Sequence, residues 1–224
     1  MLKSVINNLN HKTVQERRTK MSTNTGLVPS NGHRIQGRTT EEFLDARDII
    51  SRLNLKGNET FVDAGCGDGH ASFIAQEMMG DDSIIYALDI YQPSIEDMQK
   101  DIDKQGIQNI IPLESNIAGN ITLDDDEVDI TLMINVFHHF VAQETADDAI
   151  EELKRITKPK GKIAVMDYKK MDSGYGPPVK FKSSPEEMVE MFLKHDMKMV
   201  QLDTEVGEVL DDGTLSHYLI VFEK

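Results

Sequence analysis

Three glycines within five residues, at positions 65, 67 and 69, constrain this 224-residue chain more than any other feature. An apolar segment at residues 60–62 precedes them, and apolar residues at helical spacing follow them between positions 71 and 79. A strand, a glycine turn and a helix in this order form the crossover unit of nucleotide-binding α/β proteins. Glycine tolerates positive φ in a tight turn, and it lets backbone approach a ligand where a Cβ would collide. The stretch therefore predicts a ligand-binding turn.

The spacing of these glycines narrows the choice of ligand. It is G-x-G-x-G, whereas the dinucleotide fingerprint is G-x-G-x-x-G and places a pyrophosphate on a helix N-terminus. Asp63 comes just before the turn, and Asp89 ends the next predicted strand about 20 residues later. This combination resembles motif I of the class I S-adenosylmethionine (SAM) methyltransferases. The resemblance implies SAM as the cofactor and S-adenosylhomocysteine as the product, and it extends over about residues 40–224.

The composition indicates a single globular domain that is large enough to bury its own core. No apolar run approaches the ~18 residues that a membrane span needs, and the first residues lack the apolar region of a signal peptide. Cys66 is the single cysteine, which excludes an internal disulfide and a multi-cysteine metal site. We therefore expect a cytoplasmic protein with no membrane span.

The charge is distributed unevenly along the chain. Seven cationic residues and one acid give residues 1–40 a charge of +6. Because the net charge of the chain is −15, the remaining residues carry a charge of −21. So acidic a body repels nucleic-acid phosphates, and we do not expect a nucleic-acid substrate. Five acids within residues 123–129 predict a solvated turn rather than a spaced set of metal ligands, so no metal is expected.

The N-terminal part divides into two predicted segments. Residues 1–32 are polar and basic without apolar periodicity, which predicts a mobile tail, and Met21 is a second candidate for the start of the chain. The domain itself is expected at 33–224. Its first part, 33–58, is interpreted as a lid and helix region, because a segment in this place often covers the active site in the family that the chain resembles.

Two features of this lid region lead to specific predictions. Thr39 and Glu42 form a capping-box signature, which predicts a helix that runs to about Leu53. The polar residues before it are candidate substrate contacts, with a solvated loop as the alternative: His33, Arg34 and Gln36.

The remaining pattern predicts an α/β fold. The expected strands cover residues 60–62, 84–90, 107–115, 128–136, 162–168, 198–204 and 216–222, and the expected helices cover 70–79, 93–105, 144–156 and 184–195. The run at 128–136 is almost wholly apolar, as in a parallel strand that is buried on both faces. The resemblance implies a Rossmann-like class I methyltransferase fold: a mostly parallel seven-stranded sheet with a C-terminal antiparallel β-hairpin and helices on both faces.

The cofactor site is expected in the loops at the carboxyl ends of the strands. The resemblance assigns cofactor binding to ten residues: Asp63, Gly65, Cys66, Gly67, Gly69, Asp89, Ile90, Asn116, Ile117 and Asn135. It implies that Asp63 faces the cationic amino and sulfonium side of SAM. It also implies that Asp89 accepts hydrogen bonds from both ribose hydroxyls and that Ile90 contacts the adenine.

Three of these assignments have alternatives that the sequence leaves open. Asp89 can instead cap a helix, and Cys66 is interpreted as a small filler rather than a nucleophile. Asn116 stands where the family often has Asp. Its carbonyl oxygen can still accept a hydrogen bond from the adenine amino group, although it can equally serve as a turn residue.

The acceptor side is predicted after the fourth and fifth parallel strands. The segment 135–140 lacks the Asn-Pro-Pro-Tyr pattern of the methyltransferases that modify amino groups of nucleic acids and protein amides. It resembles instead the menaquinone- and ubiquinone-type methyltransferases, in which a histidine often follows this strand. Either histidine can serve as a general base, or can be a buried helix-capping residue. The candidate catalytic residues are His138, His139, Asp167 and Tyr168.

The expected function is methyl transfer from SAM to a small-molecule acceptor, such as a quinone-like or phenolic carbon or oxygen. Two alternatives stay open: a non-catalytic SAM-binding partner protein with the same fold, and an NAD-dependent oxidoreductase, for which the glycine spacing is wrong. A homodimer is a further expectation about partners.

Overall fold

The computed structural model describes residues 44–224. The predicted tail at 1–32, the candidate contacts His33, Arg34 and Gln36, and the capping box at 39–42 lie outside the described residues.

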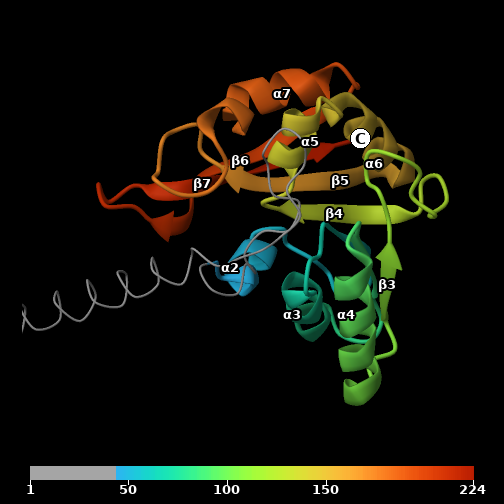
Figure 1. The fold of residues 1–224 in the computed structure, drawn as a ribbon. Coiled ribbons are helices and arrows are strands. Elements are labelled where there is room, and N and C mark those ends of the chain that lie inside the picture. Colours follow the sequence, from blue (N-terminus) through green and yellow to red (C-terminus); the bar gives the residue numbers. More distant parts are fainter. Residues whose placement is uncertain (1–43) are drawn as a thin grey trace, which may run out of the picture. The chain divides into compact units, whose positions relative to one another are not determined.

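Seven strands form one sheet in the order β3-β2-β1-β4-β5-β7-β6 (Figure 1). The strands are β1 (Thr60–Ala64), β2 (Ile84–Asp89), β3 (Ile110–Glu114), β4 (Val128–Ile134), β5 (Thr157–Tyr168), β6 (Lys198–Val209) and β7 (Leu215–Glu223). Strands β1 to β5 pair in parallel, whereas β7 pairs antiparallel with both β5 and β6. The predicted fold class, with its C-terminal hairpin, is confirmed.

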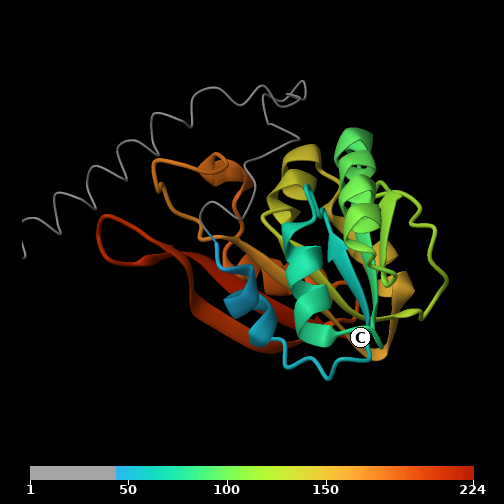
Figure 2. The same cartoon turned by 90° about the horizontal axis from the view of Figure 1, so that it is seen from below.

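Helices cover both faces of this sheet, as the two views in Figures 1 and 2 show. They are α2 (Ala46–Ser51), α3 (His70–Met79), α4 (Gln92–Gln105), α5 (Phe137–Gln143), α6 (Ala146–Ile156) and α7 (Pro185–Leu193), with a short 3-10 helix, η2 (Val179–Phe181). Residues of α2, α3 and α4 share one apolar core, and residues of α5, α6 and α7 share the other. Within residues 44–224, no helix is long and apolar enough to cross a bilayer.

The alternation of side chains along β5 explains how one strand serves both cores. Ile163 and Val165 contribute to the core under α5 to α7, whereas Ala164 and Met166 contribute to the core under α2 to α4. Successive side chains of a strand point to opposite faces, so a central strand of this sheet is largely apolar along its length. This is why the near-continuous apolar run of β4 identified it as a central strand.

Local signals fixed the ends of two helices as predicted. Helix α4 has Pro93 in its first turn and ends at Gly106, which has a φ of 70° in the left-handed region that favours glycine. Helix α7 begins with a complete capping box. The backbone N–H of Glu187 donates to the Ser184 hydroxyl, and the backbone N–H of Ser184 donates to the Glu187 carboxylate.

Among the differences from the predicted elements, three concern helix α2, strand β5 and helix α5. Helix α2 begins at Ala46, because Asp45 has an extended backbone and its side chain accepts a hydrogen bond from the backbone N–H of Asp48, so a continuous helix from Thr39 is wrong. Strand β5 begins at Thr157 rather than 162, since Thr157 already pairs with Val128 before a register shift. The third difference is α5, a helix that was not predicted.

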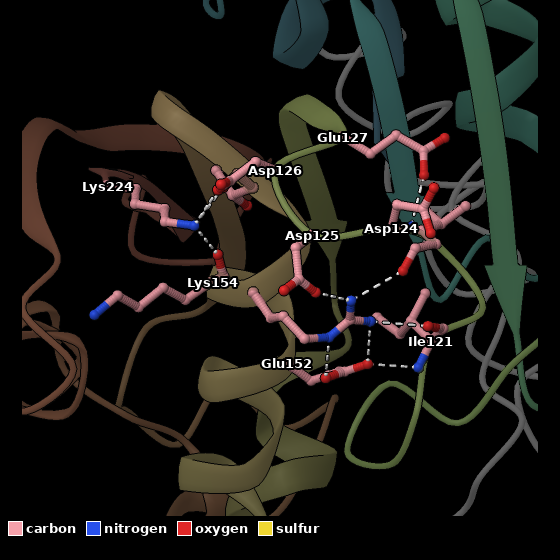
Figure 3. Close-up of polar contacts among 11 residues, drawn as sticks. Ile121, Asp124, Asp125, Asp126, Glu127, Glu152, Lys154 and Lys224 are labelled. Atoms are coloured by element: carbon pink, nitrogen blue, oxygen red, sulfur yellow. Dashed lines mark hydrogen bonds and ion pairs between the residues drawn. The ribbon is translucent and has the colours of Figure 1, made fainter.

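The acidic turn between β3 and β4 is exposed, as predicted, but its carboxylates are tied to cations (Figure 3). The Arg155 guanidinium reaches Asp125 at 2.6 Å, and the Lys224 ammonium reaches Asp126 at 2.6 Å. Glu127 accepts a hydrogen bond from the Tyr86 hydroxyl at 2.8 Å. The acids therefore anchor the start of β4 to α6 and to the C-terminal residue.

Candidate functional site

The candidate site lies at the carboxyl ends of the parallel strands. Strand β1 has β2 on one side and β4 on the other, so the chain reverses its direction of progress across the sheet between β1 and β4. Ligands of open α/β sheets bind at this switch point. The turn at 65–69 follows β1, Asp89 ends β2, and the segment 135–140 follows β4, so these sequence-predicted groups share one edge of the sheet.

The glycine turn is held by backbone hydrogen bonds and by close neighbours. The N–H groups of Gly65 and Cys66 both donate to the Leu88 carbonyl, at 2.7 and 2.9 Å. A Cβ on Gly65, whose φ is 83°, would lie 2.4 Å from a methyl carbon of Val136. A Cβ on Gly67 would meet nothing within 4 Å. The turn therefore touches protein at Gly65 but leaves room for a ligand over Gly67.

Asp63 is buried beneath this turn at 2% exposure. The Ser72 hydroxyl of α3 donates to its Oδ2 at 2.6 Å. Burial raises the pKa of Asp63 to about 7, against the effect of the Ser72 hydrogen bond and with a further contribution from the charge of Asp89. A buried carboxylate without a cation is costly, so a positively charged ligand group beside Asp63 would stabilise its ionised form.

Asp89 presents an oriented carboxylate beside the turn. Its Oδ2 accepts a hydrogen bond from the N–H of Gly67, and its Oδ1 accepts one from the N–H of Tyr91, both at 2.8 Å. Tyr91 is the N-cap residue of α4, so the helix-capping alternative is also realised. Each carboxylate oxygen has a second lone pair, and together they can accept two further hydrogen bonds. The arrangement suits a vicinal diol such as that of a ribose.

Asn135, directly after β4, has a buried side-chain amide that the described protein leaves unsatisfied. It has a φ of 59°, and its backbone N–H donates to the Met166 carbonyl at 2.9 Å. Both polar atoms of its side chain are buried and have no hydrogen-bond partner among residues 44–224. Buried amides are normally satisfied, so a polar ligand group is expected here.

Four predicted cofactor residues have less specific positions. Ile90 is 53% exposed directly after Asp89 and offers apolar surface there, whereas the Ile117 side chain is buried in the core at 5%. Asn116 is exposed, and its carbonyl oxygen accepts a hydrogen bond from the N–H of Ala118 at 3.2 Å, as a turn residue does. Cys66 is buried, and burial raises the pKa of its thiol, which agrees with a filler and not with a nucleophile.

On the acceptor side, Asp167 and His138 form a buried pair. The Asp167 carboxylate accepts hydrogen bonds from the backbone N–H of His138 and from its Nδ1, each at 2.9 Å, and from the N–H of Tyr168 at 2.7 Å. Burial alone would raise the pKa of Asp167, but the charge and hydrogen bonds of His138 outweigh it, and the pKa lies below its usual range. An ionised carboxylate only accepts, so the proton lies on Nδ1, and Nε2 is the basic nitrogen.

The other two candidate catalytic residues flank this pair. The rings of His138 and His139 have centroids 4.4 Å apart, and those of His138 and Tyr168 meet edge to face at 5.8 Å. All four candidates therefore lie together at the ends of β4 and β5. His138 is also buried and hydrogen-bonded, as in the structural alternative. The residue that caps α5 is Asp167, however, which accepts a hydrogen bond from the backbone N–H of His138 at the start of this helix.

Three buried polar residues of this region were not predicted from the sequence: Ser72, Lys182 and His217. Ser72 looked like an ordinary helix residue, and only the fold brings it under Asp63. Lys182 lies in the loop after β5 and His217 lies in β7, where no motif marked either of them. Full burial of a Lys and a His appears only in the three-dimensional structure.

A family model described as "Methyltransferase domain" matches residues 55–214, which is more than half of the chain. The chain belongs to this methyltransferase family. No curated protein matches it.

Solved structures share the fold of this methyltransferase domain. A SAM-dependent methyltransferase from Aquifex aeolicus is 24% identical with a TM-score of 0.71, covering 84% of this chain and 94% of that chain. The [4+2]-cyclase SpnF is 13% identical with a TM-score of 0.64, covering 80% and 79%. A geranyl diphosphate C-methyltransferase from Streptomyces coelicolor, in complex with Mg²⁺, geranyl diphosphate and S-adenosyl-L-homocysteine, is 15% identical with a TM-score of 0.61, covering 80% and 78%. The named reactions differ, so the likeness shows the fold alone.

Proposed function

We propose that this methyltransferase-domain protein transfers a methyl group from S-adenosylmethionine to a small-molecule acceptor. S-adenosylmethionine is its cofactor, as expected for the family to which it belongs. The observation that carries the proposal is the pair of carboxylates around the glycine turn, with Asp63 buried beneath it and Asp89 bonded to its Gly67 N–H. Supporting it are the unsatisfied amide of Asn135 and the open space over Gly67.

Each group of the cofactor has a chemically matched residue. Asp63 offers negative charge to the amino and sulfonium side, and the two oxygens of Asp89 offer acceptors to the ribose hydroxyls. Ile90 offers exposed apolar surface for the adenine. The bound cofactor supplies a methyl carbon that is activated by positive sulfur, and the protein has to align an acceptor with it and exclude water.

On the acceptor side, His138 is the proposed general base. The Asp167 carboxylate accepts a hydrogen bond from Nδ1, with 2.9 Å between Nδ1 and Oδ1, and fixes the orientation of the ring. Nε2 is then the nitrogen that takes the proton of an acceptor hydroxyl or of an activated carbon. His139 and Tyr168 are proposed to position the acceptor. A quinone-like or phenolic acceptor is favoured, because an imidazole is a suitable base for a phenolic proton and the site contains aromatic rings.

The cofactor site is tested by calorimetry with S-adenosylhomocysteine. Replacing Asp89 by Ala removes two charge-assisted acceptors, and the expected result is a loss of affinity of about 100-fold. Asp82→Ala, in the exposed turn after α3, is the matched control and should bind like the wild type. An Asp89→Ala variant with wild-type affinity would contradict the assigned cofactor site.

The reaction is tested with SAM carrying a tritiated methyl group and a small-molecule extract free of protein and nucleic acid. Label that moves into an extracted small molecule, and does so far less with His138→Ala, would support the proposal. Binding of SAM without any transfer of label would favour the non-catalytic partner instead. Label that moves only into added protein or nucleic acid would contradict the small-molecule acceptor.

A further inference from the structure

The ring of Tyr168 is surrounded by polar groups that methyl transfer as described above does not use. The His217 ring lies with its centroid 4.2 Å from that of Tyr168, and the Lys182 ammonium lies 5.3 Å from the same centroid. Tyr168 and His217 are direct partners in the antiparallel pairing of β5 and β7, so their side chains share one face of the sheet. Asp167 precedes Tyr168 and therefore points to the opposite face, where its carboxylate accepts a hydrogen bond from the backbone N–H of His138 in α5.

Lys182 is a buried cation that has no close ion pair among residues 44–224, although the charges of Asp172 and Asp167 act on it from further away. Its side chain and backbone together are only 3% exposed, and no carboxylate of residues 44–224 lies within ion-pair distance of its ammonium group. The ammonium donates to the Met171 carbonyl at 2.8 Å and to the Ser173 hydroxyl at 3.1 Å, which are both neutral acceptors. Burial lowers the pKa of Lys182, and the charges of Asp172 and Asp167 oppose this shift without cancelling it.

His217 is a fully buried imidazole with one unsatisfied nitrogen. Its Nδ1 lies 2.5 Å from the Ser216 hydroxyl, which already accepts a hydrogen bond from the backbone N–H of Glu208 at 2.9 Å. The hydroxyl is therefore best placed to donate its proton to Nδ1, which leaves the imidazole proton on Nε2. Nε2 is buried and has no hydrogen-bond partner among residues 44–224.

The protonation state of His217 follows from its surroundings. Burial lowers its pKa to about 4; the negative charge of Asp167 opposes this shift, and the positive charge of Lys182 acts in the same direction as burial. The ring is therefore neutral near pH 7, and its Nε2–H is a donor without an acceptor. Lys182 and His217 thus present two kinds of donor around one aromatic ring: an ammonium group bonded only to neutral acceptors, and an N–H that has no acceptor among residues 44–224.

Resting on the proposed function, we propose that Lys182 and His217 form, against the ring of Tyr168, a subsite that binds a carboxylate or another compact oxyanion of the methyl acceptor. An ammonium and an N–H donor are the groups that recognise such an oxygen, and a low-dielectric site strengthens the contact. The Tyr168 ring supplies apolar and aromatic surface for the body of the same molecule. The acceptor is therefore an acidic small molecule rather than a neutral one.

Loop fastening is the competing explanation for Lys182. Its two hydrogen bonds tie Met171 and Ser173 to the loop that follows β5, and this alone could account for its burial. That role needs hydrogen-bond donors but no anion. It predicts no difference between charged and neutral ligands, and it gives no reason for the unsatisfied Nε2 of His217.

The test compares acids with their neutral amides on the full chain, saturated with S-adenosylhomocysteine. The probes are acetate against acetamide and benzoate against benzamide, followed by NMR of ¹³Cε1-labelled histidine, with the His217 resonance assigned from His217→Gln. The expected result is that at least one acid shifts the His217 resonance and binds at least 10-fold more tightly than its amide. Acids and amides that behave alike would overturn the subsite.

Variants then separate charge recognition from loop fastening. Lys182→Met should abolish the preference for the acid, whereas Lys182→Arg should retain it, and Lys180→Met is the control on an exposed lysine of the same loop. If Lys182→Met fails to fold, His217→Gln takes its place, with an expected loss of acid affinity of at least threefold by calorimetry. A preference that survives these substitutions would overturn the assignment. Calorimetry with S-adenosylhomocysteine alone tests the cofactor site, so its failure is distinguishable from a failure of this subsite.

Discussion

The Asp167 carboxylate holds His138 at two points, since it accepts hydrogen bonds from the backbone N–H and from the imidazole Nδ1 of the same residue, each at 2.9 Å. One contact caps the start of α5, and the other fixes the tautomer of the ring. The same carboxylate thus joins the stability of a helix to the orientation of the proposed base. The structural and catalytic interpretations of His138 are therefore compatible.

Replacing Asp167 by Asn separates these two roles. The amide oxygen can still accept from one N–H, but it cannot hold the charge that favours the Nδ1 proton, so the basic nitrogen is no longer directed to the acceptor. We expect turnover to fall on the order of 100-fold, with SAM affinity within about twofold of the wild type. Steady-state methyl transfer and calorimetry check this.

A control for that prediction is the melting temperature. Asp167→Asn should lower it by only a few degrees, because the cap is partly preserved. If turnover is unchanged while the melting temperature falls, Asp167 acts only on the helix, and the proposed base is wrong.

The raised pKa of Asp63 predicts that SAM binding depends on pH. Burial raises this pKa to about 7, so the carboxyl group is largely protonated at acid pH, whereas a cationic ligand favours the ionised form. Binding then releases a proton, and affinity should rise by up to about tenfold per pH unit from about pH 5 to 6.5 and level off above 7. Calorimetry in buffers of different ionisation enthalpy measures both the affinity and the proton release.

The raised pKa of Asp63 affects the stability of the protein in the opposite direction to SAM affinity, because stability should fall as pH rises. The folded-state pKa of Asp63 is higher than its ordinary value of 3.8, so the folded protein holds a proton that the unfolded chain releases between about pH 4 and 7. The contribution of Asp63 to the free energy of unfolding therefore falls as pH rises through this window. Asp63→Asn should make the protein more stable than the wild type at about pH 8, and should weaken SAM binding and remove most of its pH dependence.

Much of the fold, and the grouping of the candidate cofactor residues at one end of the sheet, could be predicted from the sequence, because the determinants are local. The glycine turn, the capping box at Ser184 and the apolar run of β4 each carry their signal within about ten residues. Asp89 could be placed because it lies at the end of a strand whose position in the sheet follows from its order in the chain.

The acceptor half depends on contacts between residues that are far apart in sequence. His138 and Asp167 are 29 residues apart, and their pairing needs the parallel alignment of β4 and β5. Lys182 and His217 meet the Tyr168 ring only because β7 pairs antiparallel with β5 and the intervening loop folds back. The helix α5 was missed since the short apolar segment 137–143 has no helix signal of its own and is fixed by Asp167.

Two glycines of the same turn should respond differently to alanine. At Gly65, with a φ of 83°, a Cβ would meet the Val136 side chain at 2.4 Å, so Gly65→Ala adds a steric clash to backbone strain and should cost about 3 kcal/mol or more of unfolding free energy. At Gly67, with a φ of 56°, a Cβ meets no protein atom within 4 Å, so Gly67→Ala should cost only about 1–2 kcal/mol. Urea unfolding measures both values.

Cofactor affinity should show the complementary pattern. The methyl group of Gly67→Ala occupies the space in which the ligand is proposed to lie, so we expect at least a tenfold loss of S-adenosylhomocysteine affinity in a protein that is still folded. Gly65→Ala combined with Val136→Ala relieves the clash and should recover part of the lost stability, but not the strain of positive φ. Wild-type affinity in the folded Gly67→Ala variant would mean that the space over Gly67 is not where the cofactor binds.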